Sequence, residues 1–294
     1  MRRFRHIVVG GGMTAAAAVR GIRERDPQGT IALVGTETHP PYNRPPLSKA
    51  LWKGDAETTV WRPDDTAGAE LVLGRRITSI DAAARRLTDD RGETYEYERL
   101  LLATGGAPRR LPPPAADAIV YFRTLDDYRR LRAAADAKRR FAVIGGGFIG
   151  SEIAAALRMQ GCEVAMVIPE AGLGARVFPA ELAAHLAEFY RGKGVDVRTG
   201  EGVSGVAARK SALTIATTTN RELAADVVVA GLGIVPSVEL AQQAGLAVDN
   251  GIVVDERLRA GRPEIFAAGD VANFPSAALG HRVRVEHEDN ANAQ

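Results

Sequence analysis

Two stretches of the chain repeat one order of apolar and polar segments. Residues 6–34 read HIVVGGGMTAAAAVRGIRERDPQGTIALV, and residues 141–168 read FAVIGGGFIGSEIAAALRMQGCEVAMVI. In each stretch a short β-branched run leads into a glycine-rich turn, an alanine-rich segment of about 13 residues and a second apolar run. This order predicts a strand, a helix and a second strand. Because a helix that joins neighbouring strands makes them parallel, the repeat predicts an α/β fold with two Rossmann-like dinucleotide-binding domains.

Both turns match the dinucleotide-binding pattern of three small residues at fixed spacing. The first makes a tight turn, the second lets the backbone approach a pyrophosphate, and the third lets helix and strand pack closely. The pattern alone is common, but here each copy follows a predicted strand and opens a predicted helix. Two dinucleotides in one chain favour one bound flavin and one exchanging nicotinamide. The three positions are Gly10, Gly12 and Ala15 in the first turn, and Gly145, Gly147 and Gly150 in the second.

An acidic residue beyond each turn is expected to accept hydrogen bonds from a ribose hydroxyl. Glu170 follows the second strand of the second repeat, and its charge would repel a 2′-phosphate, which favours NADH over NADPH. Arg176 leaves an alternative open, because a guanidinium can pair with a phosphate or hold the diphosphate or ribose. In the first repeat, Glu37 is either the ribose acceptor or a solvated turn residue.

Residues 40–52 read PPYNRPPLSKALW, with prolines on both sides of one arginine. Proline fixes φ and lacks an N–H, so the run predicts a stiff loop rather than a helix interior or a central strand. This loop is either a spacer or a device that directs Arg44 and Lys49 towards a ligand. Glu152, expected in the first turn of the second helix, is predicted to pair with Lys49. The alternative is that Glu152 only stabilises the helix dipole.

Composition narrows the functional classes. The net charge of +2 argues neither for nor against an acidic partner. The single cysteine, Cys162, excludes a redox disulfide and is expected to be a small buried residue. The histidine spacing predicts no metal site, and the basic residues are not interleaved with aromatic ones as nucleic-acid binding requires. No apolar run is long enough for a membrane span, and the first strand starts at once, so a cytoplasmic protein is expected.

Further motifs give the chain a specific resemblance. RPPLSK and the late AAGD are its most specific parts, and LLATGGAPR, IPEAGLGARVFP, GLGIVPSVEL and HRVRVEHEDNA follow the same order along the chain. With the two glycine turns, they resemble the FAD-containing pyridine-nucleotide oxidoreductases of the ferredoxin reductase and apoptosis-inducing factor type. The family typically has an acidic residue at the position of Thr36, so binding of the FAD ribose is expected to rest on Glu37. Ferredoxin reductases often carry a tryptophan where this chain has Glu288.

The resemblance implies an activity and its partners. An FAD-dependent NAD(P)H oxidoreductase is expected, with hydride transfer from NADH to bound FAD and onward transfer to an external acceptor. That acceptor is a ferredoxin- or rubredoxin-type iron–sulfur protein, a quinone or oxygen. The alternative is an apoptosis-inducing-factor-like flavoprotein that senses NADH, turns over slowly and acts as a redox-linked binding partner.

The resemblance also implies site residues on two cofactors. Lys49 and Glu152 would form the catalytic pair beside the flavin. The FAD contacts would be Gly10, Gly12, Met13, Thr14, Ala15, Glu37, Arg44, Lys49, Ile77, Ala103, Thr104, Gly105, Arg123, Gly269, Asp270, His287 and Glu288. The nicotinamide contacts would be Gly146, Gly147, Phe148, Ile149, Gly150, Glu170, Arg176, Gly233 and Glu286.

The order of the motifs predicts an inserted domain. We expect a discontinuous FAD domain at 1–110 and 234–294, with an NAD(H) domain at 111–233 inserted in it. The proline-rich run at 109–114 would be the crossing between them. Family members continue beyond this point with a C-terminal α/β domain that covers the flavin and forms dimer contacts. We therefore expect this chain to be a fragment or a truncated product, and a homodimer is one expected assembly.

Overall fold

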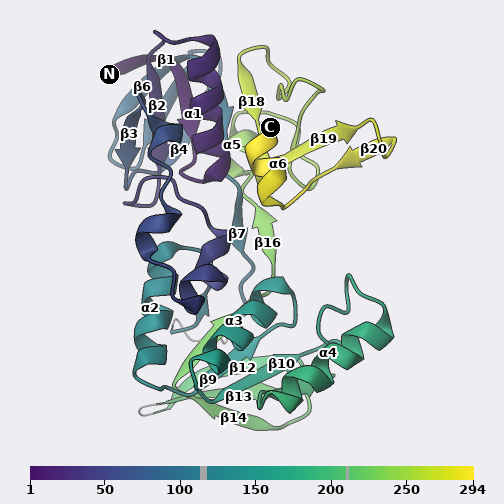
Figure 1. Cartoon of the computed structure of the whole chain (residues 1–294). Helices are drawn as coiled ribbons and strands as arrows, with labels where there is room; N and C mark the ends of the chain where they lie inside the picture. Colours follow the sequence, from purple (N-terminus) through teal and green to yellow (C-terminus); the bar gives the residue numbers. More distant parts are fainter. Residues whose placement is uncertain (113–117, 210–211) are drawn as a thin grey trace. The chain divides into compact units, whose positions relative to one another are not determined.

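A computed structural model describes residues 1–112, 118–209 and 212–294 (Figure 1). The chain forms two compact units. Unit 1 comprises Met1–Asn43, Thr58–Ala107 and Val235–Gln294, and unit 2 comprises Arg44–Glu57 and Pro108–Ile234. The segment 44–57, which we expected in the first domain, therefore belongs to unit 2. Residues 113–114 of the expected crossing lie outside the described residues.

Unit 1 is built on a seven-stranded sheet in the order β3-β2-β1-β6-β5-β4, with β18 also paired to β6. The pairs of β1, β2, β3, β6 and β18 are parallel, whereas β4 and β5 form an antiparallel excursion. These strands are β1 (Arg2–Val9), β2 (Ile31–Gly35), β3 (Glu70–Leu73), β4 (Ile77–Asp81), β5 (Arg86–Asp89), β6 (Thr94–Leu102) and β18 (Ile265–Ala267).

Helix α1 (Met13–Arg25) covers one face of this sheet. Its buried Ala15 and Val19 form a hydrophobic cluster with Val8, Leu33 and Ala103. The alanine-rich sequence suits this position, since small side chains let helix and sheet approach closely. The predicted strand, helix and strand at 6–34 are thus confirmed.

The remaining elements of unit 1 are short. Helix α6 packs against α1 and the turn η5, and β17, β19 and β20 form a small sheet (Figure 1). β7 (Gly106–Pro108) and β16 (Ile234–Pro236) pair with each other where the chain passes between the units. The others are η3 (Glu57–Val60), η4 (Asp64–Thr66), α5 (Glu239–Gln243), β17 (Ile252–Val253), η5 (Gly269–Val271), β19 (Ala272–Ser276), β20 (His281–Val283) and α6 (Glu288–Ala293).

Unit 2 is built on a five-stranded parallel sheet in the order β11-β10-β9-β15-β8. An antiparallel sheet of β12, β13 and β14 packs against one face, where Val206 and Ile215 meet Ala142 and Val228. The strands are β8 (Val120–Tyr121), β9 (Phe141–Ile144), β10 (Val164–Ile168), β11 (Asp196–Thr199), β12 (Val203–Arg209), β13 (Ala212–Thr217), β14 (Glu222–Ala225) and β15 (Val227–Ala230). The helices are α2 (Leu125–Asp136), α3 (Phe148–Met159) and α4 (Ala180–Gly192).

The proline-rich run is more ordered than a loop. It contains two 3₁₀ helices, η1 (Pro45–Ser48) and η2 (Ala50–Lys53). The two prolines of η1 occupy its first positions, where a missing N–H costs no hydrogen bond. The Trp52 indole donates to the carbonyl of Leu47 within the run (2.8 Å), and its ring meets Tyr128 of α2 edge-on.

Across the described part of the chain, no helix is both long enough and apolar enough to cross a membrane.

Candidate dinucleotide-binding sites

The first glycine turn lies at the carboxyl ends of β1 and β6. Gly10 has a φ of +133°, and a Cβ at this position would lie 2.1 Å from the carbonyl oxygen of Ala103. Only glycine therefore fits there. Gly12 is different, because no atom of the described residues lies within 4 Å of a Cβ built on it. That open space in front of α1 suits a pyrophosphate at the helix N-terminus.

The predicted FAD contacts after β6 and β18 meet at this same edge. Ala268 donates to the carbonyl of Leu102 (3.2 Å), which aligns the ends of the two strands. Gly269 then lies so close to the start of α1 that an added Cβ would be 2.2 Å from Thr14 Oγ1. Asp270 follows within η5. The structure thus brings together residues that lie more than 250 positions apart in sequence.

Other predicted FAD contacts in unit 1 are held by their neighbours. Tyr42 donates its hydroxyl to Glu37 (2.6 Å), and the Thr104 hydroxyl donates to the carbonyl of Ser237 (2.8 Å). Ile77 is buried in the hydrophobic core of the sheet. His287 caps α6 by accepting from the N–H of Asp289 (3.2 Å).

Arg284 is a residue that sequence reasoning missed. Its side chain is only 10% exposed, donates to the carbonyl of Asp270 (3.0 Å) and pairs with Glu286 (2.7 Å). It therefore links two predicted cofactor contacts within unit 1. The sequence contained a signal for Arg284, because residues 282–286 alternate between charged residues and valine and end at the predicted contact Glu286.

The second glycine turn repeats the geometry of the first. Gly145 has a φ of +102°, and its Cβ would lie 2.5 Å from the carbonyl oxygen of Gly231. A Cβ at Gly150 would lie 2.1 Å from the carbonyl oxygen of Gly145. At Gly147 the described residues again leave 4 Å of open space. Of the glycines after β15, sequence reasoning chose Gly233, whereas Gly231 makes the close contact.

The ribose-binding candidates of unit 2 form an ion pair. Arg176 Nε lies 2.6 Å from Glu170 Oε1, and the arginine is 79% exposed. Their segment folds back on the glycine turn, because the N–H of Gly174 donates to the carbonyl of Gly146 (2.8 Å). Glu170 and Arg176 thus lie beside the turn expected to bind the nucleotide.

The pair expected between Lys49 and Glu152 is present. Lys49 Nζ lies 2.9 Å from Glu152 Oε2, and the buried Ser48 donates its hydroxyl to the same oxygen (2.6 Å). The expectation that Glu152 lies in the first helical turn is wrong, because α3 begins at Phe148 and has no acidic residue there. Burial, with the negative charge of Glu152 nearby, raises the pKa of Tyr190.

Three further residues of unit 2 that the sequence analysis singled out differ in their contacts and burial. Arg44 donates to the carbonyl of Arg123 (3.0 Å). Phe148 is 64% exposed and meets Phe178 edge-on, with ring centroids 6.3 Å apart. Cys162 is buried, as expected, and burial raises the pKa of its thiol.

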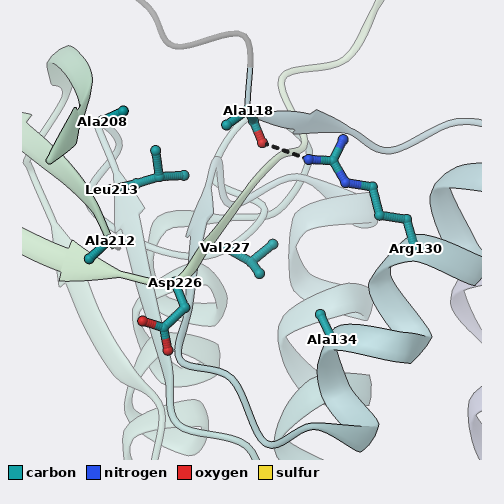
Figure 2. Close-up of a pocket in the computed structure, with 8 residues that line it drawn as sticks. All are labelled: Ala118, Arg130, Ala134, Ala208, Ala212, Leu213, Asp226 and Val227. Atoms are coloured by element: carbon teal, nitrogen blue, oxygen red, sulfur yellow. Dashed lines mark hydrogen bonds between the residues drawn. The ribbon is translucent and has the colours of Figure 1, made fainter. Parts of the chain in front are cut away.

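A hollow of about 270 Å³ in unit 2 contains none of the predicted site residues (Figure 2). Figure 2 shows Arg130 donating to the carbonyl of Ala118, at 3.3 Å. Asp226, on another wall, is paired with Arg140 (2.9 Å). The two charged side chains that line the hollow, Arg130 and Asp226, therefore already have partners within the protein. The described residues also include no group of three side chains suited to hold a metal.

Comparison with known proteins agrees with this geometry. Residues 4–294 match the family model of pyridine nucleotide-disulphide oxidoreductases. The chain belongs to this family. Members are FAD-dependent oxidoreductases that bind a nicotinamide dinucleotide, so the predicted fold class, oxidoreductase activity and pair of cofactors are confirmed at that level.

Individual members of the family are similar over most of this chain. The ferredoxin–NAD(+) reductase component of the anthranilate 1,2-dioxygenase system from Burkholderia cepacia is 40% identical over 95% of this chain and 71% of its own length. Putidaredoxin reductase from Pseudomonas putida is 36% identical over 97% of this chain and 71% of its own length. A crystal structure of a covalent putidaredoxin reductase–putidaredoxin complex gives a TM-score of 0.92 at 34% identity, covering 99% of this chain and 73% of that one.

Proposed function

We propose that this family member is an NADH-dependent reductase that passes electrons through FAD to a small iron–sulfur protein of the ferredoxin type. The names of the two bacterial relatives support the acceptor, since one is a ferredoxin–NAD(+) reductase component and the other a putidaredoxin reductase. Bound FAD would supply the chemistry that lets a two-electron donor serve a one-electron acceptor. The chain's own residues bind and orient the two cofactors.

The observation that carries this proposal is the different cover of the two glycine turns. In unit 1, Met13 is 7% exposed, and α6 and η5 pack against the start of α1. In unit 2, Phe148 and Ile149 at the start of α3 are 64% and 39% exposed. A covered turn suits a cofactor that stays bound, and an open turn suits one that exchanges in each cycle. We therefore assign FAD to unit 1 and NADH to unit 2.

The residue roles follow from this assignment. In unit 1, Gly12 leaves space for the FAD pyrophosphate, and Glu37 and Asp270 bind its sugar and ribityl hydroxyls. In unit 2, Gly147 does the same for the nicotinamide dinucleotide, and Glu170 binds the adenosine ribose. Lys49, paired with Glu152, sets the reduction potential of the flavin, because a cation favours its anionic reduced form.

The preference for NADH rests on Glu170. A carboxylate accepts hydrogen bonds from a ribose 2′-hydroxyl and repels a 2′-phosphate. Arg176 is paired with that carboxylate at 2.6 Å, so its Nε is not available to a phosphate while the pair persists.

One relative supports a second function. Apoptosis-inducing factor 1 from Dictyostelium discoideum is 29% identical over the whole of this chain and 61% of its own length. A flavoprotein of that type would bind NADH and respond to it with slow turnover.

Anaerobic stopped-flow mixing with NADH distinguishes the reductase from the NADH-sensing flavoprotein. A reductase bleaches the flavin absorbance quickly and then reduces an added ferredoxin. A long-lived charge-transfer band with slow reoxidation by ferredoxin would overturn the reductase proposal and favour the sensor.

A further inference from the structure

A buried carboxylate in unit 2 has no part in the site described so far. Glu201 follows β11, and its side chain is only 8% exposed. One carboxylate oxygen accepts from Arg221 Nη1 at 3.0 Å, and the other accepts from the Thr219 hydroxyl at 3.1 Å. Arg221 itself is 68% exposed, so only the carboxylate is removed from water, and the cost of burying that charge offsets much of its attraction to the arginine. Glu201 therefore calls for a reason other than stability.

Its place in the sheet indicates that reason. β9, β10 and β11 are parallel neighbours, so their carboxyl ends lie at one edge of the sheet. The glycine turn follows β9, Glu170 follows β10 and Glu201 follows β11. In open α/β sheets ligands bind outside this edge. Glu201 thus stands one strand beyond the proposed ribose acceptor.

The backbone around Glu201 holds the backbone around Glu170. The N–H of Gly200 donates to the carbonyl of Glu170 (3.0 Å), and the N–H of Glu201 donates to the carbonyl of Ile168 (3.1 Å). These two bonds tie the residue that carries the ribose-binding carboxylate to the segment 200–202.

That segment is tied on its other side to the turn between β13 and β14. Gly202 donates to Thr218 Oγ1 (3.0 Å), and Thr218 donates back to the carbonyl of Gly202 (2.9 Å). The Glu201 carboxylate adds Thr219 and Arg221 from the same turn. The segment 200–202 is therefore fixed between this turn and Glu170.

We infer that Glu201 is a positioning residue for the adenosine half of the nicotinamide dinucleotide. Anchored by Thr219 and Arg221, it holds the segment 200–202, which in turn holds Glu170 in reach of the ribose 2′-hydroxyl. The inference rests on the proposed function, since it needs NADH to bind at this edge.

Unit 2 contains a matched control pair. Asp226 and Arg140 form an ion pair of 2.9 Å, and they precede β15 and β9. They lie at the amino edge of the same sheet, away from the proposed nucleotide. The hydrogen bond from Arg140 holds the pKa of Asp226 below its usual range, so Asp226 is charged in this pair at neutral pH.

The test compares Glu201→Gln with Asp226→Asn in the full chain. Affinities for NADH and NADPH are measured by isothermal titration calorimetry, and NADH turnover is measured with ferricyanide as acceptor. Glu201→Gln should weaken NADH binding and raise KM about 5- to 10-fold, since a charge-assisted hydrogen bond is lost. Its kcat should stay within about 2-fold, and its preference for NADH over NADPH should narrow. Asp226→Asn should leave NADH affinity and preference unchanged.

Arg221→Gln provides a second variant, because its exposed side chain can be replaced with less risk to folding than a buried one. It should weaken NADH binding in the same direction, and the double variant should be non-additive because the two groups touch. Equal NADH affinities in Glu201→Gln, Arg221→Gln and the unmodified chain would overturn the inference alone. An unmodified chain that binds no NADH would overturn the proposed function and the inference with it.

Discussion

The two glycine turns have nearly the same backbone and very different surroundings. In both, the first glycine has a positive φ and touches a neighbouring strand end, and the middle glycine faces open space. In unit 1 the residues that follow, Met13 and Thr14, are buried. In unit 2 the corresponding Phe148 and Ile149 are exposed. On the function proposed above, the turn itself would make the pyrophosphate site, and its cover would set how long a cofactor stays.

The cover of the first turn comes from far along the chain. Gly269 and α6 lie against the start of α1, and Arg284 ties η5 to the segment before α6. The second turn is approached instead by its own unit's segment around Gly174 and by the pair of Glu170 and Arg176. The difference between the two turns can be tested by substituting residues at one turn and leaving the other unchanged.

The largest expected effect is the loss of one cofactor at a time. Gly12→Val should leave the protein colourless, because a branched side chain would fill the space of the pyrophosphate. FAD affinity should fall about 100-fold or more. Gly147→Val should keep the yellow colour and lose NADH binding. Flavin absorbance and calorimetry with NADH measure the two effects.

Gly21→Val is the control for these variants. Gly21 lies in α1, and the described residues also leave 4 Å around a Cβ built on it. It should retain both cofactors. Full flavin occupancy in Gly12→Val would show that FAD does not bind at the first turn.

The next effect concerns the choice between NADH and NADPH at the second turn. Glu170→Ala should narrow the preference for NADH by about 1–3 kcal/mol, because it removes a charge that repels a 2′-phosphate and frees Arg176. When Arg176→Ala is added to the Glu170→Ala variant, most of the improvement in the use of NADPH should be lost. Ratios of kcat/KM for the two cofactors measure this, and equal use of both by the unmodified chain would contradict it.

Arg284 provides a test of the cover on the first turn. Arg284→Met should weaken FAD binding by about 2 kcal/mol, since it removes a donor to the Asp270 carbonyl and leaves Glu286 without its ion pair. Arg284→Lys should restore part of the loss. Fluorescence titration of the apoprotein with FAD measures the affinities. Unchanged affinity in Arg284→Met would limit the arginine to a structural role in unit 1.

The smallest expected effect is on the flavin potential. Lys49→Met should spare FAD binding and lower the potential by about 30 mV, which is about 1.4 kcal/mol for two electrons. Glu152→Gln should raise it, because the partner that offsets the lysine is removed. The double variant should be non-additive, since the two groups touch at 2.9 Å. Spectroelectrochemical titration measures all four proteins, and unchanged potentials in both single variants would make residues 40–52 a spacer.

Sequence alone predicted the elements whose pattern is local. The repeats at 6–34 and 141–168 could be assigned because a glycine turn, a helical spacing and two apolar runs lie within 30 consecutive residues. The pair of Lys49 and Glu152 was also predicted, although its partners are 103 residues apart. No spacing rule reaches so far, and this prediction came from the stiff loop, expected to direct Lys49, and from the place of Glu152 just after the second glycine turn.

Tertiary structure decided the contacts that hold these parts in place. Gly231 was not distinguished from Gly233 because only the approach of β15 to the glycine turn shows which of them has no room for a Cβ. Arg284 and Glu201 were missed because an arginine or a glutamate in sequence looks like a solvated residue, and burial and partners reveal otherwise. Local sequence determines which backbone shapes form. The neighbours that fold against them determine which side chains are buried, and the energy of a charge depends on that burial.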